Sequence, residues 1–106
     1  MIYTLTTNPA IDMNVNSSTM STETVNRTSD AVYTPNGKGL NVSFTLRHYG
    51  VPSVILGFFG GFSGDYIVDG AARICPVRPV RIDGITRINL FVTTPQGEYK
   101  LPNAGA

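Results

Sequence analysis

A short glycine-rich segment is the part of this sequence best suited to binding a ligand. Residues 36–41 read NGKGLN and stand directly before a run that can form a helix. Glycines let a backbone approach a ligand closely, and the free N–H groups at a helix start favour anionic or hydroxyl-rich groups. Lys38 adds a positive charge. The spacing matches neither a Walker loop nor a dinucleotide fingerprint, and an ordinary strand-to-helix turn is the more frequent explanation of the motif alone.

Two charged residues far apart in the sequence can serve the same ligand. Asp12 stands in an uncharged stretch, and Arg87 lies within the β-rich run TRINLFV. A carboxylate accepts hydrogen bonds from hydroxyl groups, and an arginine fork suits a phosphate. A third feature, Gly60-Gly61, follows an apolar run, at the end of a strand where open α/β sheets bind ligands. Taken singly, each is more often a solvated side chain or a plain turn.

Two helices are predicted on either side of an apolar strand. Residues 40–49 fit both strand alternation and helical spacing, but the segment is long and its stop, Gly50-Val51-Pro52, favours a helix. Residues 53–59 form a continuous apolar run, typical of a parallel-sheet strand covered on both faces. The second helix is expected to be capped by Ser63 and to end before Pro76, with an inner face of Ile67, Ala71 and Ile74.

The remaining segments predict a second sheet beside this α/β unit. Residues 2–7 are β-branched and aromatic and belong with the apolar strand. A turn at Asp83-Gly84 predicts that the two segments beside it form a hairpin. Alternating apolar and polar residues predict short strands with one solvated face at 11–16, 24–34, 77–82, 85–93 and 97–101.

Composition excludes several classes of protein. The 106 residues are 42% hydrophobic and 14% charged with a net charge of +1, a globular composition that indicates neither nucleic acid nor a membrane surface as a partner. No run reaches membrane-spanning length, and the N-terminus does not resemble a signal peptide. The single cysteine, Cys75, has no partner for a disulfide, and His48 and Cys75 have no neighbours spaced for a metal site. We therefore expect a cytoplasmic protein.

Four segments form a recognisable series. In order they read TLTTNPAIDMNV, NGKGLNVSFTLRHYG, LGFFGGFSGDYI and TRINLFV. The series resembles the ribokinase-like, phosphofructokinase-B family of sugar kinases, whose motifs are T-L-N-P-[AS]-[IL]-D, G-G-K-G-x-N-V, L-G-F-[LI]-G-G-x-[ST]-G and T-R-x-N-[LV]. The resemblance runs from residue 1 to about residue 105, and it is strongest to 1-phosphofructokinases.

This resemblance implies a fold and a reaction. The fold is an α/β one, a partial ribokinase-like Rossmann-type α/β/α domain with a small β-sheet lid. The core would comprise about 1–8 and 36–76, and the lid about 11–34 and 77–101. The implied reaction is phosphorylation of a sugar phosphate with ATP and Mg²⁺, foremost of fructose 1-phosphate to fructose 1,6-bisphosphate. Kinases of tagatose 6-phosphate or fructose 6-phosphate, and an inactive sugar-binding or dimerising fragment, stay open as alternatives.

The resemblance also implies which residues bind the sugar phosphate. Asp12 would hold sugar hydroxyls, and Arg87, with Asn89, would reach the phosphate already on the sugar. Arg27 matches a lid position that in some relatives reaches the neighbouring subunit. Because the exposed edges of a lid are best covered by a partner's lid, a homodimer is expected. The sugar-binding turn would consist of Gly37, Lys38, Gly39 and Asn41.

Two departures from the family pattern bear on function. Asn36 stands where the family usually has a glycine, and asparagine tolerates positive φ better than most residues. The family's catalytic aspartate belongs to a G-A-G-D motif that these 106 residues do not contain, so the general base is expected beyond residue 106. No catalytic residue is therefore predicted here, and the chain alone is expected to bind sugar phosphate weakly without turning it over.

Overall fold

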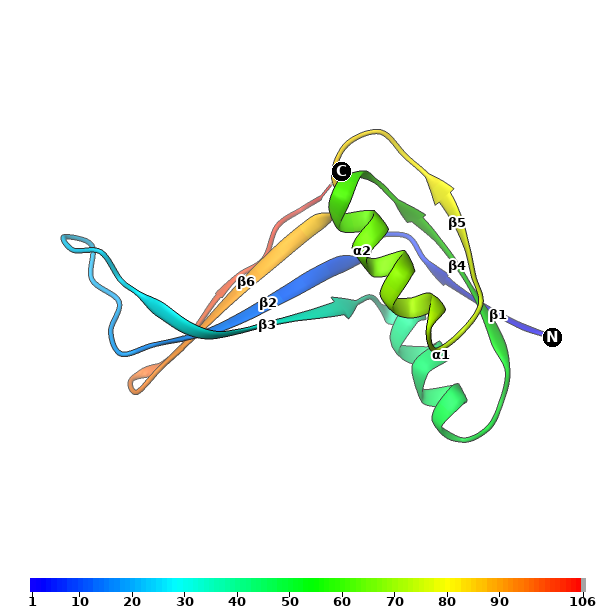
Figure 1. The fold of residues 1–106 in the computed structure, drawn as a ribbon, viewed down its shortest axis with the longest axis horizontal. Helices are drawn as coiled ribbons and strands as arrows, with labels where there is room; N and C mark the ends of the chain where they lie inside the picture. The colour runs from blue at the N-terminus through cyan, green and yellow to red at the C-terminus, as the bar shows by residue number, and fades with distance from the viewer. Residues whose placement is uncertain (106) are drawn as a thin grey trace.

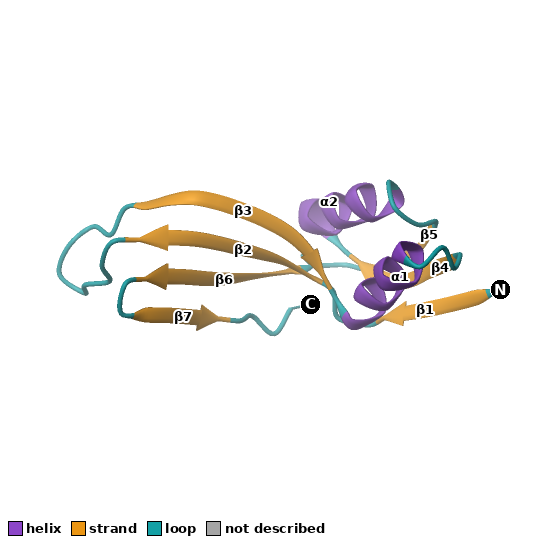
Figure 2. Ribbon diagram, turned by 90° about the horizontal axis from the view of Figure 1, so that it is seen from below, coloured by secondary structure: helices purple, strands orange, loops and turns teal. Residues whose placement is uncertain are grey.

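The computed structural model describes residues 1–105, which form two β-sheets and two helices (Figure 1). Strands β1, β4 and β5 form a parallel sheet in the order β1-β4-β5, which we call the core sheet. Strands in the order β3-β2-β6-β7 form a second sheet, the lid sheet, which extends away from both helices (Figure 2). In chain order the elements are β1 (Ile2–Thr6), β2 (Ala10–Ser17), β3 (Thr28–Asn36), α1 (Lys38–His48), β4 (Ser53–Phe59), α2 (Gly61–Ala72), β5 (Val77–Arg81), β6 (Arg87–Thr94) and β7 (Gly97–Leu101).

Both helices cover the same face of the core sheet. Strand alternation places Ser53, Ile55 and Phe59 on one face of β4. The Ser53 hydroxyl donates to the Oγ of Ser43 in α1 at 2.8 Å. Ile55 and Phe59 are fully buried in a cluster that includes Ile67 of α2. The hydrophobic core therefore lies between this face and the two helices.

The predicted strand–helix–strand unit is confirmed. Strand β1 pairs in parallel with β4, with Leu5 opposite Leu56. The ambiguous segment after the glycine turn is helical, and it ends where the sequence indicated. Gly50 adopts a left-handed conformation with φ of 75°, and the N–H of Val51 donates to the carbonyl of Leu46 at 2.8 Å. Both features are typical of a helix stopped by glycine.

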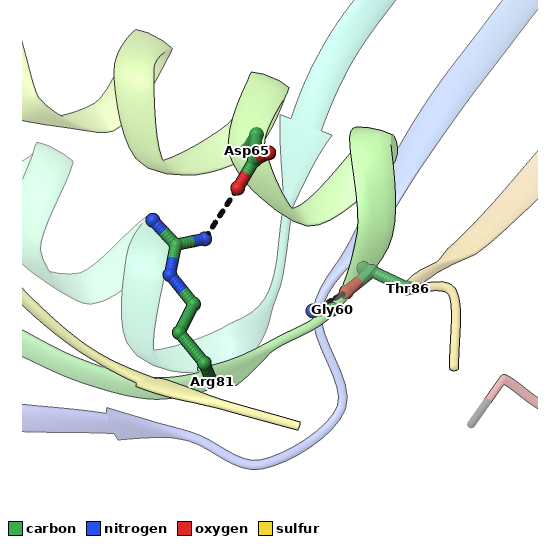
Figure 3. A network of polar contacts seen from close by, with 4 residues as sticks. All are labelled: Gly60, Asp65, Arg81 and Thr86. Carbon is green, nitrogen blue, oxygen red and sulfur yellow. Dashed lines mark hydrogen bonds and ion pairs between the residues drawn. The ribbon is translucent and has the colours of Figure 1, made fainter. Parts of the chain in front are cut away.

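Strand β5 lies in the core sheet, so the predicted hairpin of residues 77–82 with 85–93 is wrong. It pairs in parallel with β4 and forms the edge of the core sheet. Pro79, which lacks an N–H donor, is tolerated at such an edge. An ion pair of 2.6 Å between Arg81 and Asp65 joins β5 to α2 (Figure 3). Alternation alone indicates a half-buried strand, and it does not tell which sheet the strand joins.

The turn at Asp83-Gly84 carries the chain from the core sheet to the lid sheet. The N–H of Ile82 donates to the carbonyl of Phe59, and the N–H of Thr86 donates to the carbonyl of Gly60, each at 3.0 Å. The Thr86 hydroxyl accepts from the N–H of Gly60 at 2.9 Å (Figure 3). These bonds fix the crossing against the start of α2.

Two details of α2 and β3 also differ from expectation. Ser63 does not cap α2, because Gly60 occupies the cap position and the Ser63 hydroxyl donates to the carbonyl of Thr86 at 2.6 Å. Ile74 lies beyond the end of the helix and is exposed, so it is not part of the inner face. Strand β3 begins at Thr28 rather than at residue 24, and Val25 is exposed. The sequence pattern therefore predicted α2 and β3 correctly as a helix and a strand, but it misplaced the cap of α2 and the start of β3.

The other face of the core sheet carries no helix from residues 1–105. Tyr3 and Leu5 alternate with the two β1 threonines that contact α1, and they are 52% and 59% exposed. Phe58 pairs with Val80 across β4 and β5, and both are exposed as well. None of the helices in the described part of the chain has the length and apolar character needed to cross a membrane. We expect this uncovered apolar face to drive self-association.

Replacing Leu5 by lysine is expected to weaken that self-association, because the charge would have to be buried between two copies. Sedimentation velocity at several concentrations would measure the effect. Val42→Lys is the matched control, since Val42 is similarly exposed but lies on α1. A wild-type chain that stays monomeric at high concentration would contradict the expectation.

Candidate functional site

The end of β1, the start of α1 and the start of β6 surround a cavity of about 470 Å³. Its walls are residues 5–8, residues 36–38, Asn41 and Arg87. The cavity lies at the carboxyl end of a parallel strand, where open α/β sheets bind ligands. Four predicted site residues therefore line one cavity: Gly37, Lys38, Asn41 and Arg87.

Asp12 adjoins this cavity through the amide of Asn36. The register of the lid sheet places Asp12 directly beside Asn89 on β6, a neighbour 77 residues away in sequence. Asn89 donates from Nδ2 to Oδ1 of Asp12 at 3.0 Å, and Asn36 donates from Nδ2 to Oδ2 at 2.8 Å. Asp12 is half-buried and Asn89 is buried. Both oxygens of the carboxylate are thus held by amide donors, one from each neighbouring strand.

The two glycines of the turn are required by packing against β1. A Cβ atom on Gly39 would lie 2.5 Å from Oγ1 of Thr6 and 2.6 Å from the carbonyl oxygen of Leu5. A Cβ atom on Gly37 would lie 2.6 Å from Cγ2 of the same threonine. The Thr6 hydroxyl accepts from the N–H of Leu40 at 3.0 Å, which anchors the first turn of α1. The sequence suggested room for a ligand, whereas the geometry shows close contact between helix and strand.

The cavity contains two cationic side chains. Within residues 1–105 the only ion pair joins Arg81 to Asp65, so Lys38 and Arg87 carry no paired acid there. Arg87 is held by backbone carbonyls, donating from Nη1 to Asn103 and from Nη2 to Asn8, each at 3.2 Å. Each Nη atom keeps a second N–H, and Nε is buried without a partner in the described residues. The cavity is therefore suited to an anion.

Sequence reasoning missed the contribution of Asn8 and of the segment after β7. The N–H of Asn103 donates to Oδ1 of Asn89 at 2.9 Å, and Nδ2 of Asn8 donates to the carbonyl of Ala104 at 3.3 Å. These contacts bring the segment after the lid back to the site. The Asn8-Pro9 break after β1 was a signal of a turn there, but nothing in the sequence paired it with residues near 104.

Arg27 is not brought to this cavity. It is exposed and precedes the first residue of β3, whereas Asn36 ends that strand at the cavity. A strand of nine residues spans roughly 30 Å, so Arg27 lies at the far tip of the lid sheet.

Curated proteins similar to this chain include kinases of sugar phosphates. No protein-family model matches the chain. The D-tagatose-1-phosphate kinase of Klebsiella oxytoca is 48% identical over 107 residues, which covers the whole chain and 35% of that protein. The 1-phosphofructokinase of Haloferax volcanii is 37% identical over 111 residues, covering 99% of the chain and 35% of that protein.

Solved structures described as phosphofructokinases also match this chain. The phosphofructokinase-2 of Escherichia coli superposes with a TM-score of 0.88 at 30% identity, over 99% of this chain and 35% of its own. The chain thus spans about a third of the length of the relatives that it matches.

Proposed function

Because the chain belongs to the ribokinase-like, phosphofructokinase-B family and spans about a third of its relatives, we propose that it supplies the sugar-phosphate site of a longer kinase. The reaction is transfer of the γ-phosphoryl group of ATP to a ketohexose 1-phosphate. Fructose 1-phosphate, giving fructose 1,6-bisphosphate, is the foremost substrate. Tagatose 1-phosphate is the second candidate, because the K. oxytoca relative is named for it.

One observation carries this proposal: Lys38 and Arg87, which have no paired acid within residues 1–105, line a cavity that adjoins the amide-held carboxylate of Asp12. A sugar phosphate needs both halves of such a site. Its phosphate is attracted to Lys38 and Arg87, and the planar arginine fork suits it best. Its hydroxyls donate to acceptors, which the free lone pairs of Asp12 and Oδ1 of Asn41 provide. In this assignment Asn89 acts on Asp12 rather than on the phosphate.

ATP and Mg²⁺ are assigned in this proposal to the rest of the longer kinase. Within residues 1–105 no three His, Cys, Asp or Glu side chains come together as metal ligands. ATP supplies the phosphoryl group, and phosphoryl transfer rests on positioning and charge stabilisation. The contribution of this chain is to bind and orient the acceptor sugar. Because these substrates are charged metabolites and Cys75 is a free, buried thiol, we place the kinase in the cytoplasm.

We further propose that the longer kinase is a homodimer joined through the lid sheet. The lid has two exposed edge strands, β3 and β7. An apolar cavity of about 290 Å³ also opens beside its inner strands. A partner's lid would cover both features. Arg27, at the tip of β3, would then face the partner subunit rather than its own sugar site. The cavity is lined by Ile11, Met13, Tyr33, Phe62, Tyr66 and Ile88.

The function can be tested in a hybrid kinase, in which this chain replaces the matching third of the K. oxytoca enzyme. We expect the hybrid to phosphorylate ketohexose 1-phosphates, and we expect Asp12→Ala to raise the KM for the sugar phosphate roughly 10- to 100-fold, the loss typical of hydrogen bonds to a charged group. The KM for ATP should stay within about twofold.

Asp69→Ala is the matched control, because Asp69 is an exposed carboxylate on α2 outside the carboxylate network. If the hybrid kinase phosphorylated ketohexose 6-phosphates but not ketohexose 1-phosphates, the proposed substrate class would be wrong. An effect of Asp12→Ala on ATP alone would remove Asp12 from the sugar site.

A further inference from the structure

Asn36 joins the carboxylate of Asp12 to the glycine turn. Its Nδ2 donates to Oδ2 of Asp12 at 2.8 Å. Its Oδ1 accepts twice, from the N–H of Gly37 and from Nδ2 of Asn41, each at 2.9 Å. The side chain is half-buried and lines the candidate site. One amide therefore contacts the lid sheet, the turn and the first turn of α1.

This arrangement fixes the groups left to accept hydrogen bonds from a ligand. Asn36 and Asn89 hold the two oxygens of Asp12 from opposite sides, so the carboxylate cannot rotate without breaking a bond. An ionised carboxylate offers about four acceptor positions, and each oxygen keeps capacity for another donor. Because Nδ2 of Asn41 donates to Asn36, its Oδ1 is the atom left to accept.

We propose that Asn36 is a positioning residue for the sugar: its amide orients the carboxylate of Asp12 and the amide of Asn41 so that both accept ligand hydroxyls. This inference rests on the proposed function for the nature of the ligand. Asn36 also occupies the N–H of Gly37, so that donor serves the turn rather than the ligand. Supports of this kind hold binding groups in productive geometry before the ligand arrives.

The amide oxygen of Asn36 accepts hydrogen bonds from the turn and from α1, whereas its nitrogen donates to Asp12. One substitution separates these two roles. Asn36→Asp keeps an oxygen that can accept from Gly37 and Asn41, and it keeps the size of the side chain. It removes the donor to Asp12 and places a second negative charge beside it. If Asn36 only shapes the turn, this variant should lose only the modest affinity that an added negative charge costs in a site for an anion. If Asn36 positions Asp12, binding should fall although the turn is kept.

The test measures binding of fructose 1-phosphate and tagatose 1-phosphate to the 106-residue chain by NMR titration. We expect Asn36→Asp to raise Kd by about tenfold or more, the loss typical of a hydrogen bond to a charged group. Asn14→Asp is the matched control, with an Asn-to-Asp change on the same strand as Asp12. Asn14 is exposed and its side chain makes no hydrogen bond within the described residues, so Kd should stay within about twofold.

A second measurement, hydrogen exchange of the Asn36 side-chain amide, needs no ligand and does not depend on the folding of Asn36→Asp. In the free wild-type chain, the side-chain N–H of Asn36 should exchange slowly with water, and Asp12→Ala should move its resonance and speed the exchange. Equal Kd values for Asn36→Asp and the wild type, or an Asn36 amide indifferent to Asp12→Ala, would overturn the inference. If the wild-type chain bound neither sugar phosphate, the proposed ligand would be wrong, and the amide readout would still decide whether Asn36 positions Asp12.

Discussion

Replacing Arg87 by alanine is expected to raise the KM for the sugar phosphate in the hybrid kinase by about 30-fold or more. Hydrogen bonds to charged groups contribute roughly 1.5–3 kcal/mol each, and 2 kcal/mol corresponds to about 30-fold. The guanidinium is already held by the carbonyls of Asn8 and Asn103, so little order is lost when a phosphate binds. The KM for ATP should change by less than about twofold, since ATP makes no contact with Arg87 in the proposed site.

Two companion variants sharpen this expectation. Arg87→Lys keeps the charge but not the planar fork, so its KM should lie between those of the wild type and Arg87→Ala. Arg47→Ala removes an exposed arginine from the last turn of α1 and should leave both KM values unchanged. A rise in the KM for ATP, or none for the sugar phosphate, would show that Arg87 does not bind the substrate phosphate.

Gly39→Ala is expected to lower the free energy of unfolding by at least about 3 kcal/mol, at the upper end of the cost of overpacking. The added Cβ would lie 2.6 Å from the carbonyl oxygen of Leu5, and a backbone atom in a strand cannot move aside as a side chain can. Helix α1 would have to shift away from β1. Urea unfolding followed by circular dichroism would measure the loss.

Gly70→Ala is the matched control, because it makes the same change in the other helix. Its Cβ would meet only Cγ of Pro35, at an ordinary contact distance of 3.5 Å. Alanine is the better helix former by up to about 1 kcal/mol, so this variant should be as stable as the wild type or slightly more stable. Equal destabilisation by both variants would mean that the close approach of α1 to β1 is not what requires Gly39.

The sequence sufficed for the α/β unit because its signals are local. The apolar run predicted β4 as a sheet strand, although residues 1–105 cover only one of its faces with helices, and the stop at Gly50 marks the end of α1. The hairpin at Asp83-Gly84 was wrong because that turn connects different sheets, and turn chemistry does not specify the sheet that the next strand joins.

The site was harder to predict than the fold, because it depends on register. Asp12 meets Asn89 only because β2 and β6 pair in one alignment, and a shift of one residue would place the two side chains on opposite faces. The family resemblance supplied these residues without their contacts. It could not supply the role of Asn36, since that position is one where this sequence departs from the family motif.

The two halves of the candidate site belong to different sheets. Asp12 and Asn89 lie on the lid sheet, whereas Lys38 belongs to α1, which packs on the core sheet. A bound ligand that touches both halves would act as a mechanical brace, resisting any change in the angle between the sheets. Its binding strength would then depend on the stiffness of the connections between the sheets, including the crossing at Asp83-Gly84. Substitutions at that crossing, which does not line the cavity, could therefore tune affinity as strongly as those in contact with the sugar.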